Sequence, residues 1–280
     1  TVSVLYWVAT ARGAASEMFK NLYDGSITTW SPNGRLFQME YAMEAVKQGS
    51  ATVGVKSKTH AVIVALKRSP TTQLSSYQEK VFKVDKHCGL SVAGLITDGR
   101  YLASTMRSAC FEHSYQYGSP FPVKRLAQQI ADKYQSHTIV GVKRPFGVGL
   151  LIAGFDSTGP QLLQAVPSGE LHEFKATAMG ARSQSARTYL ERHYETFGDC
   201  TLDQLVTHAL KALAATTGEN VQLNTQNTTI SIVGVDQAFT VYSDANARRW
   251  LDHLEIKPED RVAGPEDDDD DEDDDEVQDA

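Results

Sequence analysis

Apolar residues recur at helical spacing ahead of the first β-rich segment of the chain. Successive members of this stripe lie three or four positions apart: Leu36, Met39, Met43 and Val46. That spacing places them on one face of an amphipathic helix. Residues 31–34, Ser-Pro-Asn-Gly, have the composition of a turn, and Gly49 stands where a C-cap glycine is expected. We therefore predict a helix that packs across one end of the domain or against a neighbouring molecule.

The rest of the pattern alternates blocks of short β-rich runs with helices. Strands are expected at 52–55, 61–66, 81–84, 90–95, 147–155, 161–166, 171–174, 230–235 and 239–242. Helices are expected from an N-cap at Asp98 to Ala109, after Pro122, and over 183–194, 202–213 and 245–254. Consecutive strands joined by tight turns indicate antiparallel sheets. The order predicts the α+β class, as a four-layer α-β-β-α sandwich of two antiparallel sheets.

Charge is concentrated at one end of the chain. The formal net charge is −8, but residues 266–276 are all acidic, and the remaining residues hold 24 acids and 27 bases. The 280-residue chain is 41% hydrophobic, enough for a sizeable core. An acidic run repels itself and has no apolar surface to bury, so residues 257–280 are predicted to be a disordered tail. A solvated tail is the simpler interpretation, and contact with basic partners is the alternative.

Cysteine and histidine usage indicates neither a disulfide framework nor a metal site. The cysteines are odd in number and far apart, at 88, 110 and 200. This pattern is typical of a reducing compartment. None of the eight histidines has a second ligand at metal-binding spacing on one helix. We expect no metal, no cofactor and no nucleic-acid partner. No apolar run is long enough to span a membrane, so no membrane partner is expected.

The first residues, 1–17, have an apolar run with no basic residue before it, which makes a poor signal peptide. We interpret them as an extension outside the fold, with an anchoring segment as the alternative.

Residues 23–49 carry a dense family motif. They read Y-D-G-S-I-T-T-W-S-P-N-G-R-L-F-Q-M-E-Y-A-M-E-A-V-K-Q-G. This block resembles the N-terminal signature of proteasome α-type subunits. Within that family, residues 51–68 are most similar to the subunits of the alpha-6 ring position, called alpha type-1 in animal naming. Two further blocks agree, at 144–156 and 180–192. The resemblance covers residues 18–254.

The resemblance implies the N-terminal nucleophile hydrolase fold without its catalysis. It divides the chain into a gate segment with the first helix, 18–49, and the sandwich, 50–256. In that fold the N-terminal residue is the nucleophile, and its own α-amine is the base. Thr1 lies far ahead of the first strand, and the matching position, 50–52, continues from the predicted helix. Leu66 stands where catalytic relatives have an aspartate. We therefore expect a non-catalytic subunit. The alternatives are a catalytic β-type threonine peptidase and a free-standing binding module with an acidic tail.

Two groups of site residues follow from the resemblance alone. The first is a cluster that holds the substrate gate open: Tyr23, Asp24, Pro32 and Tyr41. The second lines a pocket for the C-terminal carboxylate of an activator: Gly49, Lys80 and Leu95. A turn-stabilising role for the cluster and a solvated surface Lys80 are the simpler alternatives.

The resemblance also implies the setting in which the chain works. Expected partners are neighbouring proteasome α subunits, β-ring subunits and the C-terminal tails of regulatory particles or activators. The expected role is to build the outer heptameric ring, control substrate entry and dock regulatory particles for ubiquitin-dependent degradation, in cytoplasm and nucleus.

Deleting residues 266–280 should leave thermal stability unchanged, because an acidic run contributes no core burial. Differential scanning calorimetry of the full and truncated chains in their assembled form measures this. A clear fall in the melting temperature of the truncated chain would show that the tail packs against the body.

Overall fold

The computed structural model describes residues 23–67, 78–217, 222–252 and 254. The predicted extension 1–17 and the acidic tail 257–280 lie outside these residues. Within the described residues, no helix is both long and apolar enough to cross a membrane.

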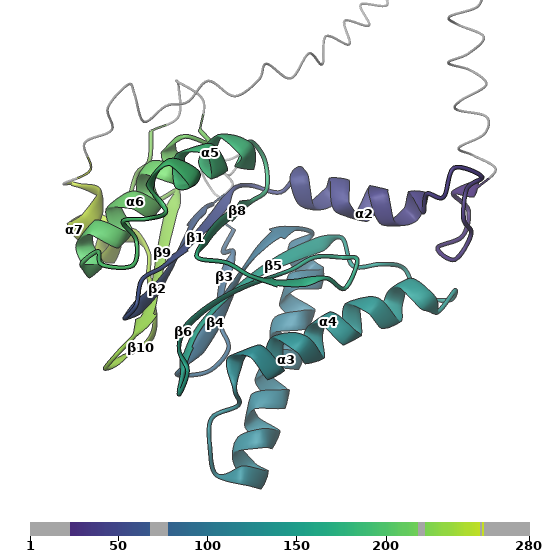
Figure 1. The fold of residues 1–280 in the computed structure, drawn as a ribbon, viewed down its shortest axis with the longest axis horizontal. Helices are drawn as coiled ribbons and strands as arrows, with labels where there is room; N and C mark the ends of the chain where they lie inside the picture. The colour runs from purple at the N-terminus through teal and green to yellow at the C-terminus, as the bar shows by residue number, and fades with distance from the viewer. Residues whose placement is uncertain (1–22, 68–77, 218–221, 253, 255–280) are drawn as a thin grey trace, which may run out of the picture.

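Two five-stranded antiparallel sheets form the centre of the molecule (Figure 1). The first has the order β10-β9-β2-β1-β8. Its strands are β1 Thr52–Lys56, β2 His60–Leu66, β8 Ala176–Met179, β9 Thr228–Gly234 and β10 Gln237–Tyr242. The second has the order β3-β4-β5-β6-β7. Its strands are β3 Val81–Lys83, β4 Cys88–Gly94, β5 Val148–Asp156, β6 Gly159–Ala165 and β7 Leu171–Glu173.

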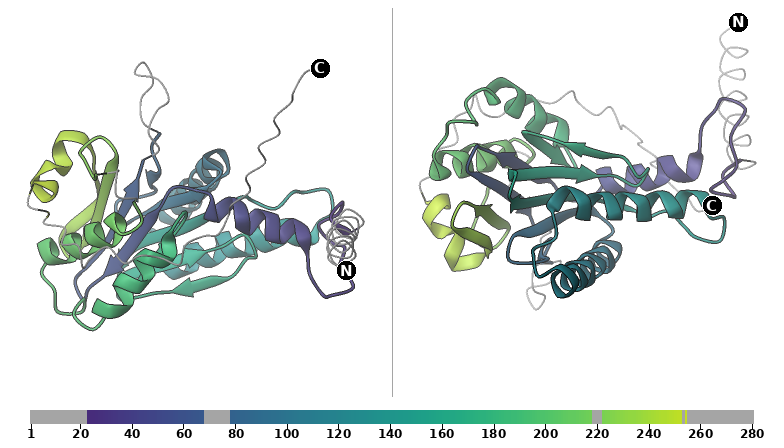
Figure 2. Two further views of the ribbon diagram at one scale, coloured as in Figure 1. Left: turned by 90° about the horizontal axis from the view of Figure 1, so that it is seen from above. Right: turned by 60° about the horizontal axis from the view of Figure 1, so that its bottom comes forward.

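Helices cover the outer face of each sheet, as Figures 1 and 2 show. The first sheet is covered by α5 Ser183–His193 and α6 Leu202–Ala214, and the second by α3 Ile96–Tyr117 and α4 Val123–Ile139. A 3-10 turn η1, Asp244–Ala247, and a short helix α7, Arg248–Leu251, follow β10. Each helix pair packs an apolar face onto its sheet, and Ile63, Leu151, Leu162 and Phe239 fill the space between the sheets. The predicted four-layer α-β-β-α sandwich is confirmed.

Local expectations succeed where the residue pattern is strong and fail where tertiary contacts decide. The strand β8 was not predicted. Its sequence, Ala-Thr-Ala-Met, is short and alanine-rich, and it is a strand because it pairs with β1 in the first sheet. Asp98 is not the N-cap of α3, because the helix begins at Ile96, with Leu95 as its N-cap. Asp98 lies in the first turn, where its carboxylate pairs with a side chain of another loop.

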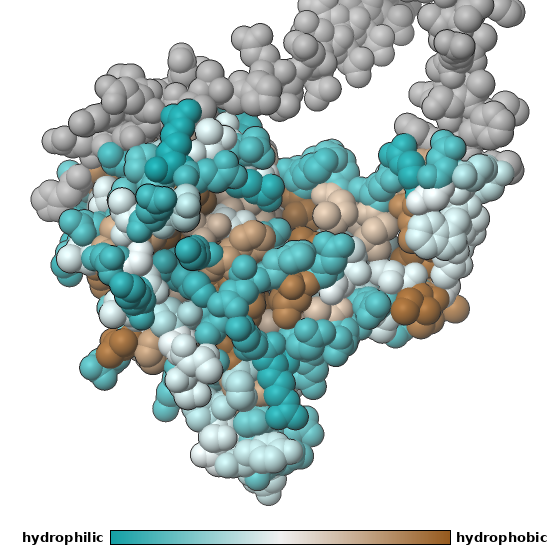
Figure 3. Space-filling model, in the orientation of Figure 1, coloured by the Kyte–Doolittle hydropathy of each residue, from teal (hydrophilic) through white to brown (hydrophobic). Residues whose placement is uncertain are grey.

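The first helix, α2 Phe37–Lys47, presents a different face to the core from the one predicted. Its buried residues are Phe37, Ala42 and Val46. Only Val46 belongs to the predicted stripe, and Leu36, Met39 and Met43 are half-buried. The predicted stripe therefore lies partly open beside the contact with the sandwich. Figure 3 shows apolar side chains gathered along α2 between the sandwich and the N-terminal loop.

The turn before α2 and the glycine after it have different physical roles. Gly34 has φ of +72°, and its N–H donates to the carbonyl of Ser31 over 2.9 Å, so 31–34 form the predicted turn. Gly49 follows the C-cap residue Gln48 but does not adopt the left-handed conformation of a capping glycine, since it is not among the glycines with positive φ. Gly49 is needed for space instead. A Cβ there would lie 2.1 Å from the backbone nitrogen of Gly94.

Three glycines let the end of α2 reach the second sheet. Besides the Gly49 contact, Gly94 has φ of +112°, and a Cβ on it would lie 2.3 Å from the carbonyl oxygen of Gly147. The Gly49 carbonyl also accepts a hydrogen bond from the Ala181 N–H over 2.7 Å. Backbone therefore packs on backbone where α2 joins the sandwich, and no larger residue fits there without movement.

Gly49→Ala should destabilise the folded chain by about 1–3 kcal/mol, because the added methyl overlaps backbone that cannot rotate away. Gly141→Ala is the matched control, since a Cβ at Gly141 meets nothing within 4 Å. Thermal unfolding of the two variants measures the difference. Equal melting temperatures would contradict the close approach at Gly49.

Candidate functional site

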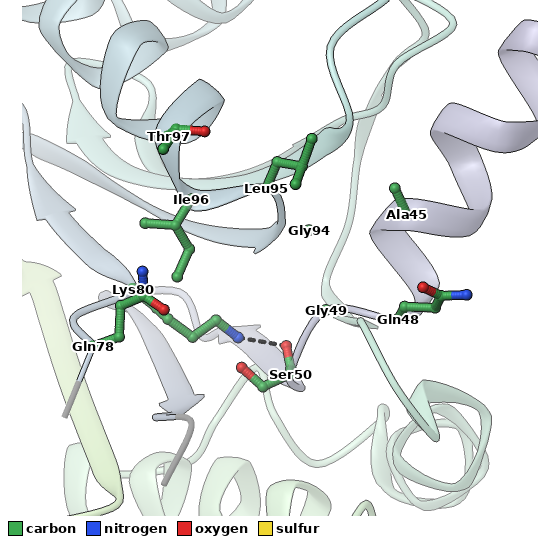
Figure 4. Close-up of a pocket in the computed structure, with 10 residues that line it drawn as sticks. All are labelled: Ala45, Gln48, Gly49, Ser50, Gln78, Lys80, Gly94, Leu95, Ile96 and Thr97. Carbon is green, nitrogen blue, oxygen red and sulfur yellow. Dashed lines mark hydrogen bonds between the residues drawn. The ribbon is translucent and has the colours of Figure 1, made fainter. Parts of the chain in front are cut away.

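A pocket opens where the end of α2 meets β4 and the start of α3 (Figure 4). Its volume is about 380 Å³. It is lined by Ala45, Gln48, Gly49, Ser50, Gln78, Lys80, Gly94, Leu95, Ile96 and Thr97. The structure thus brings together the three residues that the sequence placed in one pocket, from three separate segments of the chain. Their role in binding an activator tail stays a prediction.

Lys80 lies in the wall of this pocket and is not the solvated surface lysine of the simpler interpretation. It is only 3% exposed. Its ammonium donates to the carbonyl of Ser50 (Figure 4), to the carbonyl of Ala51 over 3.3 Å and to the hydroxyl of Thr52 over 3.2 Å. An ammonium has three donors and no acceptor, so neutral oxygens such as these can hold it in place. Lys80 therefore fixes the start of β1 and places a positive charge at the pocket.

The opposite wall is apolar and ends at a helix N-terminus. The side chain of Leu95 is 48% exposed, and the Leu95 N–H donates to the carbonyl of Gly147 over 2.8 Å. Ile96 and Thr97 follow it as the first residues of α3. The first N–H groups of a helix and its dipole favour negative charge. A ligand with an apolar side chain and a carboxylate matches this pairing of Leu95 with Lys80 and the start of α3.

An ion pair that the sequence did not reveal lies directly behind this wall. The Asp98 carboxylate accepts two hydrogen bonds from the Arg144 guanidinium, over 2.7 and 2.6 Å, and one from the Gly147 N–H over 3.2 Å. Burial alone raises the pKa of Asp98, but the Arg144 and Gly147 hydrogen bonds hold that pKa below its ordinary value. Pairing with Asp98 raises the pKa of Arg144. The sequence predicted Asp98 as a helix N-cap. It did not reveal the ion pair, because Arg144 lies 46 positions away along the chain.

Two members of the predicted gate cluster are in contact. The hydroxyl of Tyr41 in α2 donates to the Asp24 carboxylate over 3.3 Å. Partial desolvation of the exposed phenol, followed by the nearby Asp24 carboxylate, raises the pKa of Tyr41. The side-chain amide of Gln38, which the sequence did not single out, donates to the backbone carbonyl of Asp24. Tyr23 immediately precedes Asp24 and is half-buried, and Pro32 is exposed in the turn. The Asp24–Tyr41 bond ties the segment ahead of the turn to the helix after it.

Residues 50–52, which the family resemblance matches to the start of the catalytic strand, include a threonine without a free amine. The Thr52 hydroxyl lies 3.2 Å from the Lys80 ammonium and 3.1 Å from the Ser91 hydroxyl. Thr52 itself is buried inside β1, where its backbone pairs with Ala65 of β2 and Met179 of β8. The chain reaches it without a break from α2 through Gly49 and Ser50. An N-terminal nucleophile uses its own α-amine as base, so this hydroxyl has no such base.

Comparison with known proteins agrees with this geometry. The family model described as "Proteasome subunit" matches residues 46–233, and the model of the N-terminal signature of α-type proteasome subunits matches residues 23–45. Proteasome subunit alpha type-1 of Trypanosoma brucei rhodesiense is 55% identical over 243 residues, which are 87% of this chain and 91% of the relative.

Two further relatives match over most of their length. Proteasome subunit alpha type-1 of Dictyostelium discoideum is 49% identical over 85% of this chain and 96% of its own. The probable proteasome subunit alpha type-6 of Schizosaccharomyces pombe is 48% identical over 86% and 88%.

The chain therefore belongs to the proteasome subunit family, in its α-type class, which comprises the non-catalytic ring subunits of this threonine protease complex. Within that class, the relatives above carry the names alpha type-1 and alpha type-6. These are the two names of the ring position that residues 51–68 indicated, so the resemblance found in the sequence is confirmed.

Proposed function

We propose that this chain is a gating and docking subunit of the outer α ring of the 20S proteasome. It controls substrate entry and receives the C-terminal tail of a regulatory particle in the pocket of Gly49, Lys80 and Leu95. The observation that carries this proposal is the convergence of a buried ammonium and an exposed leucine at the base of α2. In this role the subunit takes part in ubiquitin-dependent protein degradation, in cytoplasm and nucleus.

Assembly into the ring would cover apolar surface that is only half-buried in the isolated subunit. The apolar stripe of Leu36, Met39 and Met43 is only half-buried, although its spacing is that of a packed helix face. A neighbouring α subunit in the ring would cover it, and a β-type subunit would stack on the ring from one side. The stripe runs along α2 toward Gly49, so a neighbour seated there would also border the pocket. Subunit contact and tail binding would then share one helix.

The gate proposal rests on the position of the Asp24–Tyr41 hydrogen bond. Asp24 stands at the start of the described chain, ahead of the turn at 31–34, and Tyr41 lies in the middle of α2. Because α2 is locked to the sandwich at Gly49, this bond transmits the position of a fixed helix to the segment before the turn. Loss of the bond would leave the fold intact and free that segment to change position.

A free-standing module with the acidic tail as its working part is the rival proposal. Size-exclusion chromatography of a native extract separates the two. The ring subunit elutes only in a particle many times its own 30.7 kDa mass, whereas the module would elute near that mass. Elution mainly at the monomer position would contradict the ring proposal.

Leu95→Glu should weaken binding of tail peptides to this subunit by about tenfold or more, because it places a carboxylate beside the expected tail carboxylate. The measurement is photo-crosslinking of synthetic peptides copying the tails of regulatory-particle subunits to purified core particles. Adducts are quantified on each α subunit by mass spectrometry. Val235→Glu is the matched control, since Val235 is 46% exposed at a distant turn. Unchanged adduct on the Leu95→Glu subunit would refute tail docking here.

Tyr41→Phe should lower activator-stimulated peptide hydrolysis several-fold while latent hydrolysis and particle yield stay near wild type. The change removes only the hydroxyl that binds Asp24. Tyr194→Phe is a matched control, since Tyr194 is similarly exposed and donates to the Glu195 carboxylate over 3.4 Å. Equal stimulation in the Tyr41→Phe and Tyr194→Phe particles would mean that this subunit does not hold the gate.

A further inference from the structure

We propose that the Asp98–Arg144 ion pair is a positioning clamp for the Leu95 wall of the tail pocket. The inference rests on the proposed function of that pocket. Neither residue lines the pocket. Both act through Gly147 and the first turn of α3, and together they set where the Leu95 side chain stands relative to Lys80.

The clamp joins three chain segments at one carboxylate. Asp98 belongs to the first turn of α3, Arg144 lies in the loop between α4 and β5, and Gly147 is the residue before β5. The Arg144 guanidinium holds both carboxylate oxygens in a bidentate pair, and the same Oδ2 accepts the Gly147 N–H. Bidentate pairing fixes orientation as well as distance. The start of α3 and the start of β5 are therefore held in one relative position.

Gly147 passes this position directly to Leu95. The carbonyl of Gly147 accepts the Leu95 N–H over 2.8 Å. The two residues are also in close contact, because a Cβ on Gly147 would lie 2.8 Å from Leu95 Cδ1. The N–H of Gly147 thus donates to Asp98, and its carbonyl accepts from Leu95 in the pocket wall. A shift of the β5 start moves the backbone and the side chain of Leu95 together.

The burial of the two partners shows what the pair does energetically. The Asp98 side chain is 8% exposed, while that of Arg144 is 63% exposed. The guanidinium is open to solvent on one side, but the carboxylate that it pairs with is nearly buried, so removal of Arg144 would leave a buried charge without a partner. This carboxylate stands in the first turn of α3, next to the pocket. Without Arg144, the Asp98 carboxylate would move toward solvent and displace the first turn of α3. Its negative charge would also repel an approaching tail carboxylate.

Two further groups hold the Arg144 end of the clamp in place. The guanidinium also donates to the carbonyl of Pro145 over 3.0 Å. A ring nitrogen of His137, near the end of α4, lies 3.1 Å from the Arg144 carbonyl, and its ring lies on Phe146 with centroids 4.2 Å apart. The arginine is therefore anchored at its backbone and its side chain.

The test uses assembled core particles carrying Arg144→Gln, Arg144→Lys or Asp98→Asn. The probe is the same set of photo-crosslinking tail peptides, titrated to obtain a half-saturating concentration on each α subunit. Arg144→Gln and Asp98→Asn should each raise that concentration about fivefold or more on this subunit only. Arg144→Lys keeps the positive charge but loses the bidentate geometry of the guanidinium. Its half-saturating concentration should therefore lie between those of wild type and Arg144→Gln. Asp199→Asn, which breaks the exposed pair with Lys58, is the control and should change nothing.

The outcomes separate the clamp from the docking proposal. Unchanged half-saturation in Arg144→Gln and Asp98→Asn, with loss in Leu95→Glu, overturns the clamp and leaves docking standing. No change in any of the three overturns docking, and the clamp with it. Equal losses of adduct on the other α subunits identify the pair as general structure and also overturn the clamp.

Discussion

The structure depends on one backbone contact, in which Gly49 at the end of α2 meets Gly94 at the end of β4. A Cβ at Gly49 would lie 2.1 Å from the Gly94 nitrogen, so the two chain segments touch without side chains between them. Gly147 closes the contact from the other side of Gly94, and Ala181 binds the Gly49 carbonyl. Everything proposed for this subunit lies around this point: the pocket beside it, the helix that leads to the gate, and the clamp behind Gly147.

The same region lacks the free α-amine that catalysis in this fold requires. Lys80 donates to Thr52 and to the carbonyls of Ser50 and Ala51, the residues that the family resemblance matches to the catalytic N-terminus. Here the chain continues from α2 into β1 without a free terminus, and α2 occupies the space ahead of β1. The lysine keeps a buried ammonium near a threonine, but the α-amine that would make the hydroxyl reactive is absent from this position. That ammonium lies instead in the wall of the pocket at the base of α2.

The sequence predicted most of the fold because its signals were local. Alternating and helical periodicities located nearly every element, and the turn at 31–34 was read from Pro32 and Gly34 alone. What failed needed distant partners. Strand β8 exists because β1 lies beside it, Asp98 faces Arg144, and Gly49 is required by Gly94 and not by its own φ. The grouping of Gly49, Lys80 and Leu95 came from family resemblance, since no periodicity connects residues on three separate segments.

The most direct test of this account is a structure of the assembled core particle bound to a regulatory-particle tail. The account predicts a tail in the pocket at the base of α2, with a terminal carboxylate oxygen within about 3.5 Å of Lys80 Nζ and the last apolar side chain against Leu95. It also predicts that the Asp98–Arg144 pair is intact behind that wall. A pocket filled by side chains of the neighbouring subunit, with tails seated only at other ring positions, would contradict the account.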